Sequence, residues 1–227
     1  GSFVTIRYVE HVLDGGVMKS DLMEHVQPDG SVRKVWDTFD AFEWPGGGLE
    51  DGFGRFSWPH ANSMYYDAKN EKILVSLYYL GTIAQIDLAT GQLDWMLGGE
   101  FSDWTIVGES FSFQHGPALF DEGRGLTLLD NGDALLGDAG VARAYLLDEG
   151  TRTATATWKF DNNGAYTHLL LGGVDPVPGG AYAVNWGTRG VLQRVSAEGD
   201  VELELSSNMG SFFGFTEHLA EFAGASR

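Results

Sequence analysis

The sequence contains no cysteine, and this absence removes several kinds of chemistry from consideration. Without thiols the chain can have no disulfide, no thiolate nucleophile and no cysteine-ligated zinc site. Long hydrophobic runs are missing too, because no stretch approaches the roughly 20 apolar residues that a membrane-spanning helix needs. No secretory hydrophobic region opens the chain either. We therefore expect no membrane span, and we find no signal peptide in the sequence given.

Basic side chains are scarce, since 14 Lys and Arg face 32 Asp and Glu and give a formal net charge of −18. Nucleic acids and anionic membrane surfaces both require a basic footprint, so we exclude nucleic acid as a partner. The acidic surface also repels anionic ligands, although physiological salt screens this repulsion beyond roughly 8 Å. No glycine-rich phosphate loop or dinucleotide fingerprint is present, and we expect no cofactor.

The composition is that of a folded globular protein rather than a disordered one. Apolar residues make up 43% of the chain and charged residues 20%, so a hydrophobic core can form. A length of 227 residues allows one large all-β domain or two small ones. An apolar stripe with helical spacing is found only near residues 216–222, where we expect one short helix.

A hairpin pattern recurs four times along the chain. In each copy an apolar strand leads through a turn that contains glycine into a second strand, which is the local chemistry of β-hairpins. The turn glycines are Gly30, Gly91, Gly150 and Gly199. Three of the four outgoing strands end in tryptophan. Between the hairpins, residues 73–77, 126–129 and 181–186 read as inner strands, so each unit offers about four strands.

This repetition predicts an all-β fold, a β-propeller with about four blades in this chain. We place its units at 3–45, 58–104, 112–160 and 166–206, followed by a closing segment over 207–227. Propellers typically carry four to eight blades, and an open ring leaves a strand edge exposed to aggregation. We therefore expect residues 1–227 to form a single propeller domain or the C-terminal part of a larger, six-bladed-like one. Another chain or segment would then complete the ring.

Two histidines lie at equivalent points of successive units. One stands in Trp58-Pro-His60-Ala-Asn-Ser63 and the other in Phe113-Gln-His115-Gly-Pro117. The Gly-Pro pair after His115 forces a turn and frees its ring from strand packing. A third motif, Leu129-Asp-Asn-Gly132, is by itself the commonest short hairpin signal. From its residue type alone, His60 can equally be a loop residue that caps a strand.

The order of these motifs resembles the arylsulfotransferase family, β-propellers that move a sulfuryl group between phenols without a nucleotide donor. The resemblance implies that His60 and His115 line a central funnel and contact the sulfuryl group, whose transition state needs cationic donors such as protonated imidazoles. It implies the same for Arg143, whose planar guanidinium suits sulfate oxygens, although a surface arginine is the alternative reading. Further binding residues that we expect at the site are Asn62, Asn131, His168, Asn185, Trp186 and His218.

The resemblance also implies an extracytoplasmic, periplasmic or secreted location and a small aromatic sulfate, a phenol or another anion as the ligand. It covers the C-terminal half of the family pattern or somewhat more. One departure concerns the histidine that takes the sulfuryl group covalently in the family. The corresponding stretch here, 179–187, has none, and Asn185 and Trp186 stand where it is expected. His168 could replace it from an adjacent strand.

Three readings of function therefore stay open. The first is an arylsulfotransferase-like transferase, and the second is a non-catalytic propeller that serves as a binding or assembly module. The third is carbohydrate recognition, for which Trp44, Trp58, Trp104 and Trp186 offer stacking platforms. We expect no metal site, because the histidines lack zinc-ligand spacing. Ca²⁺ in the acidic loops 130–138 and 161–164 is a weak alternative to solvated turns.

Overall fold

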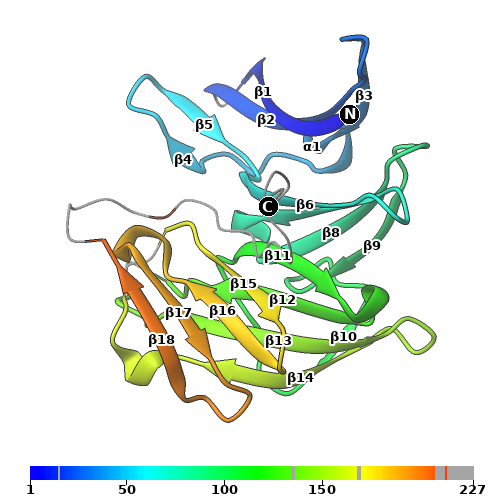
Figure 1. Cartoon of the computed structure of the whole chain (residues 1–227). Coiled ribbons are helices and arrows are strands. Elements are labelled where there is room, and N and C mark those ends of the chain that lie inside the picture. The colour runs from blue at the N-terminus through cyan, green and yellow to red at the C-terminus, as the bar shows by residue number, and fades with distance from the viewer. Residues whose placement is uncertain (15, 134–135, 168–169, 208–212, 214–227) are drawn as a thin grey trace.

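The computed structural model describes residues 1–14, 16–133, 136–167, 170–207 and 213. Within them the strands form sheets that follow one another in chain order, from the blue first sheet to the orange last strands of Figure 1. The expected helix over 216–222 lies outside the described residues, as do His168 and His218.

The first sheet is built around a long hairpin of two 11-residue strands. β2 pairs with β1 along one edge, while its other edge pairs with β3 antiparallel and with β5 in parallel. The short strands β4 and β5 lie in the Gly-rich segment between the first two predicted units. The strands are β1 (Phe3–Leu13), β2 (Gly16–Val26), β3 (Val32–Asp37), β4 (Leu49–Glu50) and β5 (Arg55–Ser57), and one helical turn, α1 (Thr38–Ala41), follows β3.

The second sheet has the simple order β6-β7-β8-β9, with every neighbouring pair antiparallel. Its strands are β6 (Ala61–Asp67), β7 (Lys72–Leu77), β8 (Thr82–Asp87) and β9 (Leu93–Leu97), with the 3-10 turn η1 (Tyr78–Leu80) after β7. The turn between β8 and β9 packs against the first sheet. A Cβ on Gly91 (φ 73°) would come within 2.1 Å of the Val35 carbonyl oxygen, so only glycine fits there.

The third and fourth sheets repeat this meander. In the third, β10 joins the outer edge of β14 in parallel, in the order β10-β14-β13-β12-β11; the fourth has the order β15-β16-β17-β18. The strands are β10 (Thr105–Val107), β11 (His115–Phe120), β12 (Gly125–Asp130), β13 (Val141–Asp148), β14 (Thr153–Phe160), β15 (Gly173–Val177), β16 (Ala181–Asn185), β17 (Val191–Val195) and β18 (Val201–Ser206). The 3-10 turns are η2 (Asp121–Gly123), η3 (Asn162–Gly164) and η4 (Gly187–Arg189).

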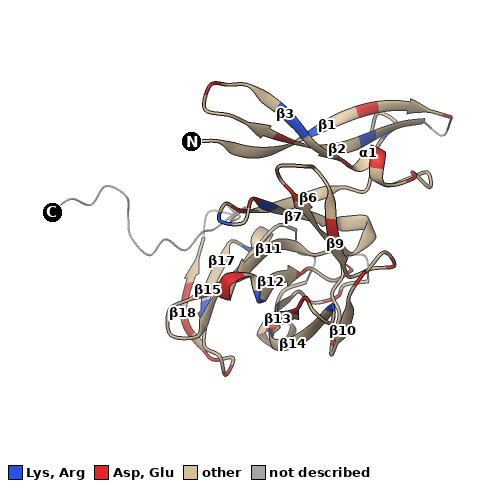
Figure 2. Ribbon diagram, turned by 90° about the vertical axis from the view of Figure 1, so that its right-hand side faces the viewer, with Lys and Arg blue, Asp and Glu red and all other residues tan. Residues whose placement is uncertain are grey.

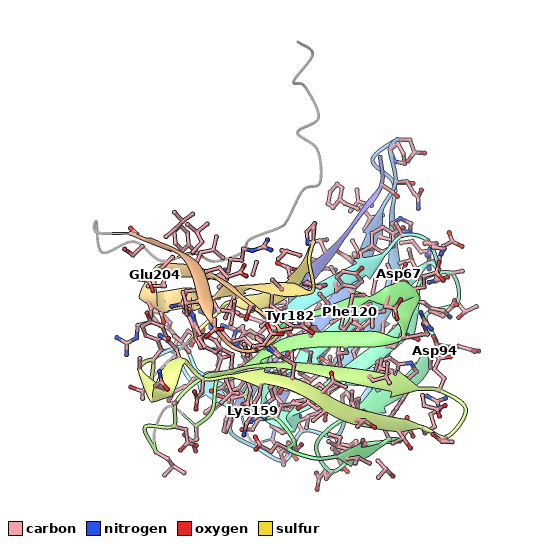
Figure 3. The ribbon with its side chains drawn as sticks, turned by 60° about the horizontal axis from the view of Figure 1, so that its bottom comes forward. Asp67, Asp94, Phe120, Lys159, Tyr182 and Glu204 are labelled. Atoms are coloured by element: carbon pink, nitrogen blue, oxygen red, sulfur yellow. The ribbon has the colours of Figure 1, made fainter. Side chains whose placement is uncertain are left out.

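Buried side chains fill the space between each pair of successive sheets. Trp36 lies in the cluster between the first two sheets, Trp95 in the next and Trp186 in the last. Between the third and fourth sheets, Trp158 stacks on Tyr182, which Figure 3 labels, with ring centroids 4.1 Å apart. Antiparallel sheets that pack face to face in chain order are the blades of a β-propeller. The predicted all-β propeller fold is therefore confirmed.

The innermost strands differ from the expected ones. Residues 73–77, 126–129 and 181–186 belong to β7, β12 and β16, which are second in their sheets. The edge strands that approach one another are β6, β11 and β15. Two of them contain proline, Pro117 in β11 and Pro176 in β15, which an edge strand tolerates because one side of its backbone donates to no neighbour.

Charge is spread over the whole molecule. Figure 2 shows acidic residues on all four sheets, with basic residues scattered between them. Among the described residues, no helix has the length and apolar character needed to cross a membrane.

Candidate functional site

The inner strands begin from strained backbone. His60, directly before β6, has φ 66°, Phe113, two residues before β11, has φ 51°, and Leu171, two residues before β15, has φ 64°. Left-handed φ is unfavourable for residues with a side chain, by roughly 1–3 kcal/mol, and such residues cluster at functional sites. The strain therefore marks the ends of the inner strands as a candidate site.

Side chains of β6 and β11 lock these two strands together. Asn62 donates its Nδ2 to the Gln114 carbonyl oxygen at 2.8 Å, and the Gly116 N–H donates to Ser63 Oγ at 2.9 Å. The buried Gln114 amide donates to Ser76 Oγ of β7 at 3.0 Å. Asn62, expected to bind a ligand, thus has its amide nitrogen engaged in holding the strands together.

His115 is held in one tautomer by its neighbours. Its Nδ1 lies 2.8 Å from Asn131 Oδ1, and Asn131 Nδ2 donates to the Leu171 carbonyl oxygen at 3.2 Å. Because a carbonyl oxygen only accepts, the second bond fixes the orientation of the Asn131 amide, and its Oδ1 must accept from His115. His115 therefore carries its proton on Nδ1 and a lone pair on Nε2. The structure brings the two predicted residues together.

Tyr78 lies between the two histidines. Its ring centroid is 5.7 Å from that of His60 and 6.4 Å from that of His115, and Phe113 packs on it at 4.9 Å. Tyr79 adds a further contact to His60. Tyr78 is not among the residues predicted for the site, although two tyrosines between an apolar strand and Gly81 indicate an aromatic turn at a strand end.

His60 takes part in this cluster from the start of β6. Its Nδ1 lies 3.1 Å from Ser57 Oγ, and the N–H of the next residue, Ala61, donates to Asp21 Oδ2 of β2 at 2.9 Å. Burial raises the pKa of this Asp21 carboxyl to about 6. The backbone that carries His60 is thus tied to the first sheet.

The two imidazoles of the site, those of His60 and His115, are neutral at pH 7. Burial lowers the pKa of His60 and, with a smaller effect of the His60 charge, lowers the pKa of His115 to about 4. Burial also raises the pKa of Tyr78, with a contribution from the Asp133 carboxylate. The protonated imidazoles expected from the sequence are therefore replaced by neutral ones in the free protein, because burial penalises the charged form.

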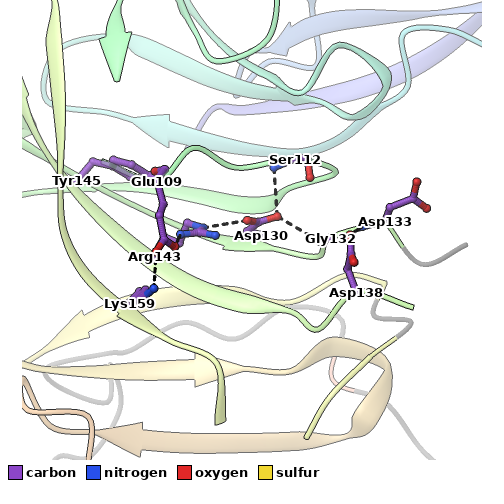
Figure 4. A network of polar contacts seen from close by, with 9 residues as sticks. All are labelled: Glu109, Ser112, Asp130, Gly132, Asp133, Asp138, Arg143, Tyr145 and Lys159. Carbon is purple, nitrogen blue, oxygen red and sulfur yellow. Dashed lines mark hydrogen bonds and ion pairs between the residues drawn. The ribbon is translucent and has the colours of Figure 1, made fainter. Parts of the chain in front are cut away.

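Arg143 is not part of the contacts around the histidines. It projects from β13, and its Nε donates to Asp130 Oδ2 at 2.8 Å and its Nη1 to Glu109 Oε2 at 2.9 Å. Figure 4 shows this ion-pair network, which Lys159 joins through Glu109. Two of the guanidinium nitrogens that we expected to meet sulfate oxygens, Nε and Nη1, thus donate to carboxylates.

Trp186 and Asn185 are placed in the core instead of at an open site. Trp186 is fully buried, and its Nε1 donates to Gln193 Oε1 at 2.7 Å. Asn185 is buried as well, and its Oδ1 accepts from the Gly187 N–H. Trp104 also lies in a buried cluster, so neither it nor Trp186 can serve as a stacking platform for a sugar.

The start of β15 lacks the side chains that mark β11. Phe113-Gln114-His115 stands before and at the start of β11, whereas Leu171-Gly172-Gly173 stands at β15. A Cβ on Gly116 would come within 2.5 Å of the Gly172 carbonyl oxygen, so the two strands nearly touch here. Within the described residues, no group of three or more His, Asp or Glu side chains is arranged to hold a metal ion.

The cluster can perform proton transfer. A neutral imidazole with a fixed lone pair can accept a proton or attack an electrophile, and phenolic hydroxyls such as that of Tyr78 can donate to an anion. Tyr78, Tyr79 and Phe113, each partly exposed, add aromatic surface beside the two imidazoles. These features describe a partly exposed aromatic cluster in which the buried His115 can accept a proton.

Comparison with protein families gives one match over most of the chain. The model of the family described as Arylsulfotransferase (ASST) matches residues 6–212. A search of the curated proteins finds no match.

Several solved structures are similar at low identity. The β-propeller domain of Myceliophteria thermophila Cps50 (Swd1) is 11% identical, with a TM-score of 0.46, 85% of this chain covered and 57% of that one. Virginiamycin B lyase from Staphylococcus aureus is 10% identical, with a TM-score of 0.43 and coverage of 93% and 62%. A Bacteroides caccae protein of unknown function is 12% identical, with a TM-score of 0.48 and coverage of 88% and 58%. The chain thus spans about three fifths of the length of these structures.

Proposed function

The chain belongs to the arylsulfotransferase family, and from this premise we propose that its cluster of His60, Tyr78 and His115 transfers a sulfuryl group between phenolic compounds. The observation that carries the proposal is the His115 tautomer. Asn131 holds the proton on Nδ1, which leaves the Nε2 lone pair for chemistry at a site surrounded by aromatic rings.

In the proposed reaction His115 acts as a general base. The acceptor phenol gives its proton to His115 Nε2 while its oxygen forms a bond to the sulfur of the aryl sulfate. The bond between sulfur and the donor oxygen breaks, and the departing phenolate takes up the proton that His115 Nε2 has just accepted, which returns His115 to its neutral form. The sulfuryl group passes directly between the two oxygens, so no covalent enzyme intermediate is required.

The low basicity of His115 in the free protein fits this role only when the ligand is bound. An anionic sulfate ester near the ring favours the charged imidazolium and raises the pKa of His115. Tyr78 and His60 supply hydrogen-bonding groups next to the same ligand. Binding of the aryl sulfate therefore raises the basicity of His115, which then accepts the proton of the acceptor phenol.

A second candidate is a non-catalytic binding module. The start of β15 favours it, because Leu171-Gly172-Gly173 offers no nucleophile where β11 carries His115. Asp133, whose charge reaches Tyr78, also disfavours an anionic transition state. Such a module would bind an aromatic ligand without turnover.

Sulfuryl transfer from 4-nitrophenyl sulfate to phenol tests the two candidates. We expect release of 4-nitrophenol by the wild type that depends on phenol and is lost in His115→Ala. Equilibrium binding of phenyl sulfate that requires His115, without any turnover, would support the binding module. Turnover that survives in His115→Ala would contradict the role of this residue.

The proposal extends to location and assembly. Family membership favours an extracytoplasmic protein. We also propose that another chain or segment covers the last sheet, since Val201, Leu203 and Leu205 of β18 are 44%, 54% and 52% exposed and exposed apolar patches mark interaction surfaces. Light scattering distinguishes a second copy of the chain, which doubles the mass, from a monomer.

A further inference from the structure

We propose that Arg143 is a positioning residue, which acts through Asp130 to hold both loops that meet in the His115–Asn131 hydrogen bond. This role differs from the contact with sulfate that the sequence resemblance implies. It rests on the proposed function only in taking His115 as a working group, and the measurements below do not depend on turnover.

Asp130 is the junction between the two loops. One of its carboxylate oxygens, Oδ1, accepts from the Ser112 N–H at 3.1 Å and from the Gly132 N–H at 3.1 Å. Ser112 lies three residues before His115, and Gly132 follows Asn131 directly. A single oxygen thus joins the loop that leads to the imidazole and the turn that carries its partner amide.

Arg143 holds the other oxygen of the same carboxylate. Its Nε donates to Asp130 Oδ2 at 2.8 Å, and both side chains are largely buried, with 11% and 8% exposed. Figure 4 shows the line of contacts from Arg143 through Asp130 to Ser112 and Gly132. A buried carboxylate that loses its partner cation is destabilising, so the Arg143 ion pair stabilises Asp130 in its bridging position.

On its outer side Arg143 also contacts the exposed Glu109, which Lys159 binds as well. Arg143 Nη1 donates to Glu109 Oε2 at 2.9 Å, while Lys159 binds the other Glu109 oxygen. The two cations, Lys159 first, lower the pKa of Glu109 to about 2. The guanidinium therefore bridges an exposed carboxylate and a buried one, a task for which its planar fork of donors is suited and a lysine ammonium is not.

The variants Arg143→Lys and Asp130→Asn test the proposal, with Glu109→Gln as the matched control. Two quantities are measured by NMR in each protein: the hydrogen-exchange protection of the Ser112 and Gly132 amides, and the tautomer of His115 from its ring nitrogen shifts. In Arg143→Lys and Asp130→Asn we expect protection of both amides to fall about tenfold or more, the scale of one charge-assisted hydrogen bond. His115 then becomes a mixture of tautomers.

The control separates positioning from general loss of packing. Glu109→Gln removes the exposed partner and leaves the Arg143–Asp130 pair, so we expect both amides to stay within about twofold of wild type and His115 to keep its Nδ1 proton. Titration with inorganic sulfate adds a second readout. An Arg143→Lys protein that binds sulfate more weakly but keeps the wild-type His115 tautomer would overturn the proposal in favour of direct contact.

A measurement on the wild type keeps the proposal testable if both variants fail to fold. The Ser112 and Gly132 amides lie in loops, where amides without a partner exchange freely. We expect them to be protected like amides of the neighbouring strand β12. Free exchange of either amide in the wild-type protein would show that Asp130 does not hold that loop, and the proposal would fail.

Discussion

The two histidines of the site are held in different ways. The backbone at His60 is fixed from outside its own sheet, because Asp21 of β2 accepts the Ala61 N–H. His115 is fixed from within its own sheet, by Asn131 at the end of β12 and by the buried pair of Asp130 and Arg143 behind it. The His60 side therefore depends on how the first sheet docks. The His115 imidazole is oriented by a residue of its own blade, although the neighbouring Gln114 and Gly116 also bond to the second sheet.

Burial shifts the pKa values of Asp21 and His115 in opposite directions. It raises the pKa of Asp21 to about 6 from 3.8 and lowers that of His115 to about 4 from 6.5. The folded protein thus loses stability as the Asp21 carboxyl ionises, and it loses stability as the His115 imidazole becomes protonated. Lowering the pH therefore favours the folded state through Asp21, on the His60 side, and disfavours it through His115.

The largest expected effect separates the chemical roles of the two histidines. His115→Ala should lower kcat/KM for transfer from 4-nitrophenyl sulfate to phenol by about 10²–10⁴-fold, the usual contribution of a general base. His60→Ala removes only a binding contact, and we expect a loss of about tenfold. The comparison breaks if the two variants lose activity equally, or if His60→Ala is the more damaging one.

The pH dependence of stability comes next in size. The Asp21 contribution is present below pH 3.8 and is lost as pH rises through about 6, while the His115 contribution is present above pH 6.5 and is lost as pH falls toward about 4. Each is worth about 3 kcal/mol at most. Removing the Asp21 contribution should therefore make stability rise more steeply with pH between 4 and 6.

Urea unfolding of wild type and Asp21→Asn across this range measures that slope. His115→Asn should change it in the opposite direction and make the rise shallower. Equal slopes in all three proteins would show that burial does not set these two pKa values.

Loss of the Asp21 acceptor should disturb one side only. In Asp21→Ala the buried Ala61 N–H loses its partner, which costs about 1–3 kcal/mol of unfolding free energy. The NMR signals of His60 should shift, while those of His115 stay in place. Asp29→Ala is the control, because Asp29 is an exposed turn residue that accepts from the Ser31 N–H. Equal shifts at both histidines would refute independent support.

The smallest expected effect concerns Tyr78, which both histidines share. Tyr78→Ala exposes the two imidazoles to water, so the pKa of each should rise by about one unit or less. Tyr78→Phe keeps the ring and should leave both values unchanged. NMR titration of the ring protons follows His60 and His115 separately. A change in the pKa of one histidine alone would mean that Tyr78 shields only that imidazole from water.

Local sequence chemistry accounts for much of the fold. Glycine-containing turns between apolar strands predict the hairpins that join β2 to β3, β8 to β9, β13 to β14 and β17 to β18. Outgoing strands that end in Trp36 and Trp95 predict packing between sheets. The same pattern does not predict the inner strands β11 and β15. Both contain Gly and Pro, which have low strand propensity and are tolerated at an edge.

The site is only partly visible in the sequence. The resemblance to the arylsulfotransferase family implies that His115 and Asn131 share one site, and the structure pairs them. The sequence does not reveal that Arg143 pairs with Glu109, 34 residues away, or that Asp21, 40 residues away, supports Ala61. Nor does it reveal that the imidazoles are neutral, since burial depends on how distant segments pack.

The most direct test of the account is the state of the His115 ring with and without phenyl sulfate, followed by nitrogen NMR. We predict a neutral imidazole with its proton on Nδ1 in the free protein at pH 7, and a rise of its pKa when phenyl sulfate binds. A proton on Nε2 in the free protein, or a His115 pKa that phenyl sulfate does not change, would contradict a general base at this position.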